Sequence, residues 1–348
     1  MKSNETYIIG EIGQNHNGSI DLAKLIIEVV ARPIKDELFN RILTPINAVK
    51  LTKRDLKEEL TDSAMKKPYN SPHSFGKTYG DHREFLELND EEHFEAYKHA
   101  KSHGIDFIET LTAIGALSLL KLFTPDRLKV ASRDLTNHPL LERMAETKIP
   151  IILSTGMGGP QEIDLALQII TKYHDNIAIL HCLSEYPAKY ENLNLNSIKY
   201  LQKNYSDYII GYSDHSIGIS VPVAAVAMGA KIIEKHITLD RKMKGTDQIG
   251  SLGVDGVWRM VRDIRNIEQS LGKDEIFISD SVTSAKNKLE RSIATKSTLE
   301  VGEIIKENDL HMLSPGDGLR WHERNKLIGK IINSKILENE IIYSKYVD

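Results

Sequence analysis

The stretch "YIIGYSDHSIGISVPVAAVAMGAKIIEKHIT", residues 208–238, contains one complete unit of the predicted fold. Two isoleucine-rich runs, 208–214 and 231–238, have the length and composition of buried strands. The small apolar residues between them are typical of a helix. Because neighbouring parallel strands need a helical crossover of this length, the stretch predicts a β–α–β unit of an α/β protein.

The same alternation recurs along most of the chain. Apolar runs predict eight strands, at 6–13, 46–52, 106–112, 127–133, 150–156, 176–182, 208–214 and 231–238. Amphipathic stretches such as "EEHFEAYKHAKSHG" and "EIDLALQIITKYH" separate them, and a last helix, "GVWRMVRDIRNIEQSLG", follows the eighth. Eight repeats favour the α/β class with a (β/α)8 TIM barrel. An open doubly wound sheet is the alternative, but the glycine-rich phosphate fingerprint of that fold is missing.

Two segments interrupt the repeats. Residues 53–88 are polar and rich in Pro, Gly and Ser, and they follow the carboxyl end of the second strand, so we expect them to cover the barrel mouth. Near the end, short strand-like pieces separated by acidic and glycine turns predict a small β-rich domain. The expected division is a barrel at 1–272, a linker at 273–288 and a small domain at 289–348.

Composition limits the classes of function. The 348 residues carry a formal charge of −4 and no basic helix, which gives no indication of a nucleic-acid partner. Apolar runs stay well below the roughly 20 residues of a membrane span, and the first residues lack the apolar core of a signal peptide. The single cysteine, Cys182, excludes an intramolecular disulfide and is interpreted as a small buried core residue. We therefore expect a cytoplasmic protein without membrane contact.

Polar side chains end nearly every predicted strand. In a parallel barrel the active site lies at these carboxyl ends. The candidates are Glu11, Lys50, Thr52, Thr110, Lys129, Ser132, Asp134, Ser154, Tyr186, Ser213, His215, Glu234 and His236. Strand ends that only met solvent would not need Lys, Glu and His inside apolar runs, so these residues predict a functional site.

Two histidines, His215 and His236, end the last two strands. A single strand histidine is more often a hydrogen-bonded core group than a ligand. Neighbouring strands, however, lie about 4.8 Å apart, so both imidazoles can reach one divalent ion and leave positions open for substrate. Glu234, Asp214 and Asp247 are expected to orient these ligands or to complete the coordination sphere.

Two lysines, Lys50 and Lys129, lie inside strands, where burying an ammonium group is costly. With Ser132 and Ser154 they predict a pocket for a phosphate or a carboxylate. A lysine that forms a Schiff base with a carbonyl substrate is the competing interpretation.

At this point the chain resembles the sialic acid (nonulosonic acid) synthase family over nearly its whole length. The segments "GEIGQNHNG", "AVKLTKRD", "LKVASRD", "PIILSTGM", "LHCLSEYP", "IIGYSDHS", "IIEKHITLDR" and "GTDQIGSLG" occur in the order and spacing of that family. The last residues resemble its C-terminal antifreeze-like (SAF, β-clip) domain. One such segment is weak evidence, whereas eight in order are specific.

The resemblance implies condensation of phosphoenolpyruvate with the aldehyde of an open-chain amino sugar, giving a nine-carbon 2-keto acid and phosphate. It implies that a divalent ion, Mn²⁺ with Mg²⁺ or Co²⁺ as alternatives, is bound by His215 and His236 and polarises the aldehyde. The implied phosphoenolpyruvate contacts are Lys50, Lys129, Ser132, Ser154, Thr110 and Ser213; the implied catalytic carboxylates are Glu11, Asp134, Glu234 and Asp247; and the implied sugar contacts are Tyr186 and Ser314.

The resemblance also implies a domain-swapped homodimer in which each small domain caps the partner's barrel. Two positions depart from the family: Ser314 replaces an arginine that recognises an N-acetyl group, and Thr52 replaces a glutamine. These departures question N-acetylmannosamine itself as the substrate, and they leave the expected phosphoenolpyruvate and metal positions intact.

Three other functions compete with this one. A shorter 3-deoxy-ulosonate phosphate synthase shares the enolpyruvate chemistry but has no antifreeze-like tail. A metal-dependent barrel hydrolase leaves the paired strand lysines without a role. A non-catalytic carbohydrate- or ice-binding protein does not need charged groups at the barrel mouth.

Overall fold

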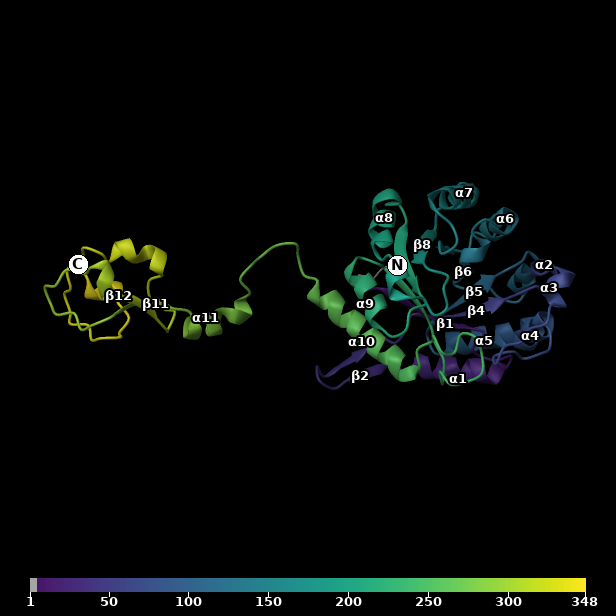
Figure 1. Ribbon diagram of the computed structural model, residues 1–348, viewed down its shortest axis with the longest axis horizontal. Helices are drawn as coiled ribbons and strands as arrows, with labels where there is room; N and C mark the ends of the chain where they lie inside the picture. The colour runs from purple at the N-terminus through teal and green to yellow at the C-terminus, as the bar shows by residue number, and fades with distance from the viewer. Residues whose placement is uncertain (1–4) are drawn as a thin grey trace. The chain divides into compact units, whose positions relative to one another are not determined.

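The computed structural model describes residues 5–348. The chain divides into two compact units, Met1–Gly272 and Lys273–Asp348, which are described separately below (Figure 1).

The first unit is built on eight parallel strands that close into a barrel, which confirms the predicted fold class. In barrel order the strands run β1, β10, β9, β8, β7, β6, β5 and β4, and β4 pairs with β1 to close the circle. Their bounds are Tyr7–Gly13 for β1, Ala48–Lys53 for β4, Asp106–Leu111 for β5, Arg127–Val130 for β6, Ile151–Ser154 for β7, Ile177–Cys182 for β8, Ile209–Asp214 for β9 and Ile232–His236 for β10.

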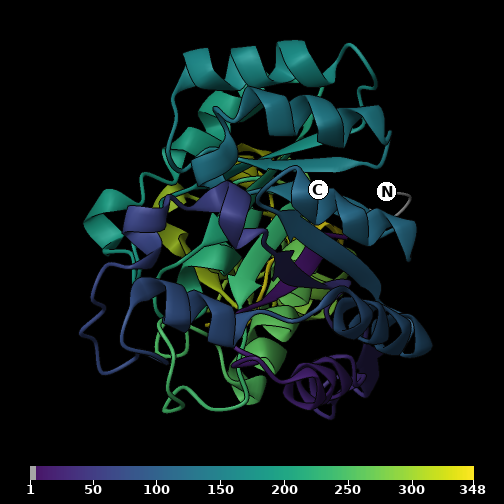
Figure 2. The same ribbon diagram turned by 90° about the vertical axis from the view of Figure 1, so that its right-hand side faces the viewer.

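Helices surround the strands, as Figure 2 shows for the same unit. They are α1 (Ile20–Val30), α5 (Asp90–Ser102), α6 (His138–Glu146), α7 (Pro160–Ile170), α8 (Asn196–Asn204), α9 (Ser220–Ala227) and α10 (Val254–Ser270). The connection between β5 and β6 is an exception, because it holds only the 3-10 helix η1, Gly115–Lys121. None of the helices in the described part of the chain is long and apolar enough to cross a membrane.

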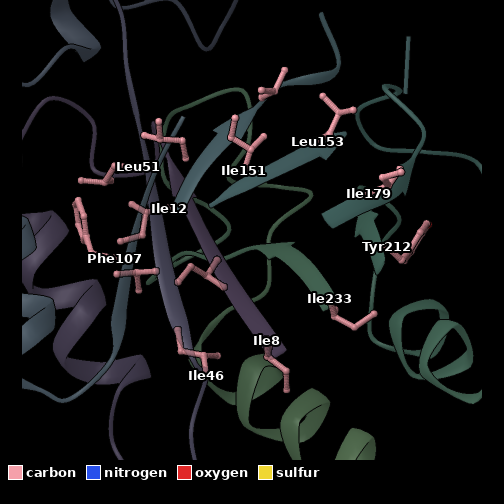
Figure 3. Packing of buried hydrophobic residues seen from close by; sticks show 14 of the residues in the cluster. Ile8, Ile12, Ile46, Leu51, Phe107, Ile151, Leu153, Ile179, Tyr212 and Ile233 are labelled. Carbon is pink, nitrogen blue, oxygen red and sulfur yellow. The ribbon is translucent and has the colours of Figure 1, made fainter. Parts of the chain in front are cut away.

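The outer face of the barrel carries the main hydrophobic core. Side chains such as Ile8, Phe107 and Tyr212 are fully buried and pack between the strands and the helices, as Figure 3 shows. Because successive strand residues alternate between the two faces, the neighbours of these residues point into the barrel.

The inner face has two levels. The lower level is apolar and consists of Tyr7, Ile9, Ala48, Ile108, Ile152, Ala178, Leu180 and Ile232. Two residues further along several of these strands stand polar groups: Glu11 follows Ile9, and Lys50 follows Ala48. The period of two therefore puts an apolar floor beneath a polar level at the carboxyl ends of the strands.

Two connections carry additional structure. An antiparallel hairpin, β2 (Ile34–Asp36) with β3 (Arg41–Leu43), lies between α1 and β4. The segment 53–88, predicted as a polar loop, contains the short helices α2 (Leu56–Glu59), α3 (Asp62–Met65) and α4 (Tyr79–Leu86). The side chains of Asp55, Thr61 and Thr78 cap their first turns.

The second unit has its own small core, formed by Ile293, Leu299, Ile305, Leu310, Leu327, Ile332, Ile336 and Ile342. Its strands β11 (Ser292–Thr295) and β12 (Leu310–Leu313) pair antiparallel. The segment predicted as a linker contains the 3-10 helix η4 (Asp280–Val282), and α11 (Thr283–Leu289) begins within it. Three further 3-10 helices follow, η5 (Glu307–Asp309), η6 (Trp321–Lys326) and η7 (Ser344–Tyr346).

Candidate active site

A cavity of about 660 Å³ opens at the carboxyl ends of the barrel strands. Pockets of roughly 300–1,000 Å³ suit small-molecule ligands. The predicted residues that line it are Glu11, Lys50, Thr52, Thr110, Lys129, Ser132, Ser154, Tyr186, Ser213, His215, Glu234, His236 and Asp247. The structure therefore brings most of the strand-end candidates to one place.

Two lysine–carboxylate pairs form the charged centre of the cavity. The Nζ atom of Lys50 lies 2.6 Å from Glu11 Oε2, and it donates to Thr110 Oγ1 at 2.9 Å. Lys129 Nζ donates to Glu234 Oε1 at 3.0 Å, and Ser213 Oγ donates to the same oxygen at 3.1 Å. Strand pairing explains this arrangement, because Glu11 is level with Lys50 in the barrel and Ser213 is level with Glu234.

The two carboxyl groups differ in protonation. Burial raises the pKa of Glu11; Lys50 opposes the shift and Glu234 adds to it, so the pKa stays above the usual range. Burial also acts to raise the pKa of Glu234, but Lys129 and Lys50 together lower it below the usual range. One carboxyl group thus tends to keep a proton while the other is ionised, which is the pattern of an acid–base pair.

The two histidines meet at the cavity wall. Their ring centroids lie 5.6 Å apart, and the ring of Tyr186 lies 4.1 Å from that of His215. The Nδ1 atom of His215 is 2.8 Å from the carbonyl oxygen of Leu183. That contact favours a proton on Nδ1 and leaves Nε2 with a free lone pair. The buried Nδ1 of His236 has no hydrogen-bond partner.

These features suit a divalent ion. Since a metal–nitrogen bond is about 2.1 Å long, two imidazoles on one ion have centroids no more than roughly 6.5 Å apart. The pair His215 and His236 meets this condition. Within residues 5–348, however, no group of three or more His, Cys, Asp or Glu side chains is arranged to hold a metal. Any ion must therefore take its remaining ligands from substrate, from water or from a side chain that moves.

Asp214 was expected to orient or to complete the metal site, and it lies outside the cavity wall. Its carboxylate pairs with Lys235 Nζ on the outer face of the barrel, where both side chains are fully buried. It also accepts from the backbone N–H and the hydroxyl of Ser216, each at 3.0 Å. Lys235 in turn donates to the carbonyl oxygen of Ser216. His215 lies between Asp214 and Ser216 in the chain, so these contacts hold the residues on both sides of it in place.

Another predicted residue of the first unit, Asp134, does not line the cavity. Asp134 is buried just behind the wall, where its carboxylate accepts from Arg133 Nε at 3.4 Å and from Asn137 Nδ2 at 3.5 Å; burial raises its pKa. It is the last residue of the 3-10 turn Ser132–Asp134 that follows β6, and the other two residues of that turn line the cavity. Ser314 belongs to the second unit, where its hydroxyl donates to the carbonyl oxygen of Leu289 at 2.9 Å.

Sequence reasoning missed several residues of the cavity wall. The segment after β4, predicted to cover the mouth, supplies Arg54, Tyr69, His73, Tyr79 and Arg83. Gln14 and Arg133 complete this side of the wall, just beyond β1 and β6. The available signal was the position of Arg54, which directly follows the strand β4.

Cys182 is buried, as predicted, but it lines the cavity and does not belong to the outer core. Its Sγ atom lies 3.9 Å from His215 Nδ1. The alternation along β8 accounts for this, because Cys182 follows the inward-facing Leu180 by two residues.

Comparison with known proteins places these features in a wider group. The sequence pattern of the NeuB family matches residues 43–276. The N-acetylneuraminate-9-phosphate synthase of Homo sapiens is 33% identical over 344 residues, covering 98% of this chain and 92% of the relative. An N,N'-diacetyllegionaminic acid synthase of Campylobacter jejuni is 34% identical over 346 residues, with 97% and 99% covered. The crystal structure of an N-acetylneuraminic acid synthetase from Leptospira borgpetersenii in complex with citrate superposes with a TM-score of 0.68 at 31% identity, covering 81% of this chain and 90% of that one.

Proposed function

The chain belongs to the NeuB family, and on that basis we propose that it condenses phosphoenolpyruvate with the aldehyde of an open-chain amino sugar. The products are phosphate and a nonulosonic 2-keto acid. The relatives are named as synthases of different nonulosonic acids. Their names therefore support the class of reaction and do not identify the sugar that this chain uses.

The observation that carries the proposal is the pair of buried lysines inside the cavity, Lys50 and Lys129, surrounded by hydroxyl donors. Phosphoenolpyruvate has a carboxylate and a phosphate, and two lysines with Thr110, Ser132, Ser154 and Ser213 offer charge and donors for both. The buried Ser154 hydroxyl has no hydrogen-bond partner and remains free to donate.

The two carboxyl groups fit the proton transfers of this reaction. The C3 carbon of phosphoenolpyruvate forms the new bond to the aldehyde carbon, and the aldehyde oxygen takes up a proton. Water then adds at C2, losing a proton, and the C2–O bond to phosphate breaks. Glu11, with its raised pKa, is the candidate donor to the aldehyde oxygen, while ionised Glu234 is the candidate acceptor from water.

His215 and His236 are the residues that would hold a divalent ion, by resemblance Mn²⁺. Their spacing and the free Nδ1 of His236 support this assignment. When bound, the ion supplies Lewis-acid polarisation of the aldehyde oxygen. Tyr186, whose ring lies 4.1 Å from that of His215 at an interplanar angle of 44°, is a proposed contact to the sugar. Asp247, which also lines the cavity, is a further candidate catalytic carboxylate.

The second unit is proposed to act as an antifreeze-like cap on the barrel of a second copy in a homodimer. In this arrangement the cap excludes water that would hydrolyse the activated intermediate. Ser314, short and neutral, cannot form the paired hydrogen bonds that a guanidinium gives to an N-acetyl carbonyl, so we expect weak selection for that group.

The test is phosphate release from phosphoenolpyruvate with Mn²⁺ and a panel of aldoses, followed by mass spectrometry of the product. We expect a product equal to the aldose plus pyruvate, and loss of turnover after chelation that Mn²⁺ restores. Release of phosphate without an aldose points to a hydrolase, and a product from a shorter sugar phosphate points to a 3-deoxy-ulosonate phosphate synthase. Failure of every aldose to give phosphate contradicts the proposal and favours a carbohydrate-binding protein.

A further inference from the structure

The outer face of the barrel holds a second buried acid–base pair, on strand β5. Glu109 Oε1 lies 2.7 Å from Nδ1 of His93, which belongs to helix α5. Both side chains are no more than 1% exposed, and neither lines the cavity. The proposed reaction leaves this pair without a role.

Apolar side chains surround Glu109 on the sheet. Leu51 and Leu128 are level with it on the neighbouring strands β4 and β6, and Phe107 and Leu111 lie on the same face of β5 before and after it. A leucine in place of Glu109 would continue this hydrophobic core. Since apolar residues often replace a buried polar pair without loss of stability, stability alone does not account for a carboxylate at this position.

The two groups of the pair depend on each other for hydrogen bonding. Oε2 of Glu109 and Nε2 of His93 are buried and have no hydrogen-bond partner. Within residues 5–348 the contact between Oε1 and Nδ1 is therefore the one hydrogen bond that joins each side chain to the protein. The pair ties β5 to α5, and breaking it from one side leaves a buried polar group unsatisfied.

Strand β5 has a weaker anchor on its other side. In a barrel of this type an α-helix normally follows each strand and packs back against the sheet. The connection that follows β5 holds the 3-10 helix η1 in place of an α-helix. The contact with α5, the helix that precedes β5, therefore fixes the carboxyl end of the strand.

The inward neighbour of Glu109 is Thr110, which lies between the two lysines of the cavity. Thr110 Oγ1 accepts from Lys50 Nζ at 2.9 Å, and Thr110 is level with Lys129 on β6. Burial acts to lower the pKa of Lys50, but nearby carboxylates raise it above its usual range, and Glu109 is one of them. The pair behind the strand is thus coupled to the lysines in front of it.

Resting on the proposed function, we propose that Glu109 and His93 are positioning residues for phosphoenolpyruvate. The pair anchors β5 to α5 and so holds Thr110 between Lys50 and Lys129, at the spacing that the two anionic groups of the substrate require. Neither residue of the pair contacts the substrate. Removing the anchor weakens phosphoenolpyruvate binding even where the replacement packs equally well.

The experiment separates binding from stability in the full-length protein. The double variant Glu109→Leu with His93→Leu replaces the pair by apolar side chains, so its thermal midpoint should stay near that of the wild type. Calorimetric titration with phosphoenolpyruvate should nevertheless give a dissociation constant about tenfold or more above the wild-type value. His93→Leu alone breaks the anchor from the helix side and should show the same loss, which keeps the test available if the double variant does not fold.

Glu109→Gln is the conservative variant, because its amide oxygen can still accept from His93. It should bind phosphoenolpyruvate nearly as tightly as the wild type. Lys101→Met is the matched control. Lys101 also joins α5 to β5, since its Nζ lies 3.5 Å from Oδ1 of Asp106, the first residue of the strand, and neither residue lines the cavity. The control should bind phosphoenolpyruvate like the wild type, because this contact lies at the opposite end of β5 from Thr110.

An unchanged dissociation constant in the folded variants without the anchor overturns the inference. Equal weakening by Lys101→Met also overturns it, since any contact between α5 and β5 would then act alike. Binding by Glu109→Gln as weak as that of the double variant overturns it too, because the charge and not the anchor would then matter. Failure of the proposed function has a different signature: the variants rank as expected in phosphoenolpyruvate binding, but no aldose makes the wild type release phosphate.

Discussion

Strand β10 carries two buried ion pairs on adjacent residues, one on each face of the barrel. Glu234 points inward and accepts from Lys129 at 3.0 Å, and Lys235 points outward and pairs with Asp214. All four side chains are almost inaccessible to solvent. Their surroundings differ: the inner pair lines the cavity, whereas the outer pair is enclosed by the strand, Tyr212 and Ser216.

Both pairs are therefore deeply buried, but they face opposite sides of the barrel and differ in how fully their carboxylates are hydrogen-bonded. The outer carboxylate has all its acceptor positions occupied by protein donors, from Tyr212, Ser216 and Lys235. The inner carboxylate keeps one buried oxygen, Oε2 of Glu234, without a hydrogen-bond partner. A satisfied pair supports the structure, and an unsatisfied pair beside a cavity is available for chemistry.

The largest effect should come from Glu234→Gln, which removes the inner charge and keeps the volume. We expect kcat to fall by about 10²–10⁴, the range for losing a general acid or base. The thermal midpoint should fall less than that of the outer-pair variant Lys235→Met, because the amide oxygen can still accept from Lys129 and Ser213 and the inner pair lines the cavity. Phosphate release and a thermal melt measure both quantities. A kcat within tenfold of the wild type would remove Glu234 from the chemistry.

The outer pair should respond in the opposite way. Lys235→Met leaves Asp214 buried without its cation, and breaking such a pair costs about 3–5 kcal/mol of unfolding free energy. Because the pair anchors the residues on both sides of His215, Mn²⁺ affinity should also fall by about 10–100-fold.

The double variant Lys235→Met with Asp214→Leu separates the two effects. It should regain most of the lost stability, since apolar residues often replace a buried ion pair without cost. It should not regain Mn²⁺ affinity, because Ser216 still lacks its partners. Urea unfolding and titration of the free protein with Mn²⁺ provide the measurements. Recovery of affinity together with stability would mean that the outer pair has no positioning role.

A smaller effect is expected for Lys129→Ala, on the inner pair. Losing a hydrogen bond between charged groups costs about 1.5–3 kcal/mol, so the KM for phosphoenolpyruvate should rise by about 10–150-fold. The KM for the aldose should change little. An unchanged KM for phosphoenolpyruvate would place Lys129 outside its binding site.

The same lysine and Lys50 test the Schiff-base alternative. Borohydride reduction in the presence of substrate should leave the mass of the protein unchanged. A trapped adduct on either lysine would instead identify a covalent mechanism.

The sequence predicted the residues of the inner pair, but it did not predict the cavity residues that lie outside the barrel strands. Strand periodicity placed Lys129 and Glu234 on the inner face, because a period of two fixes direction wherever the strand itself is recognised. All eight strands were found. The predicted run 127–133 was too long, since the strand ends at Val130 and a 3-10 turn follows, whose last residue, Asp134, does not line the cavity.

Residues of the segment after β4 were beyond this reasoning. Arg83, on the short helix α4, lines the cavity and donates to Gln14, and the period of the barrel strands does not encode such a contact. The hairpin formed by β2 and β3 was likewise not predicted, because its strands are only three residues long.

The smallest predicted effect concerns Glu11, on the strand next to the inner pair. Burial and Glu234 raise the pKa of Glu11 from 4.5 to about 7 against the opposing effect of Lys50. Between these values the folded protein keeps a proton that the unfolded chain has released, so this group makes stability fall as pH rises through the window. The pKa of Glu234 is lowered, so its titration changes stability only below pH 4.5 and does not contribute within this window. Glu11→Gln should therefore be stabilised relative to the wild type more at pH 7.5 than at pH 5. Taking the difference between variant and wild type cancels the buried histidines, which titrate in both proteins. Urea midpoints at the two pH values measure this difference, and a constant difference would mean that Glu11 ionises at its ordinary pKa and is no candidate acid.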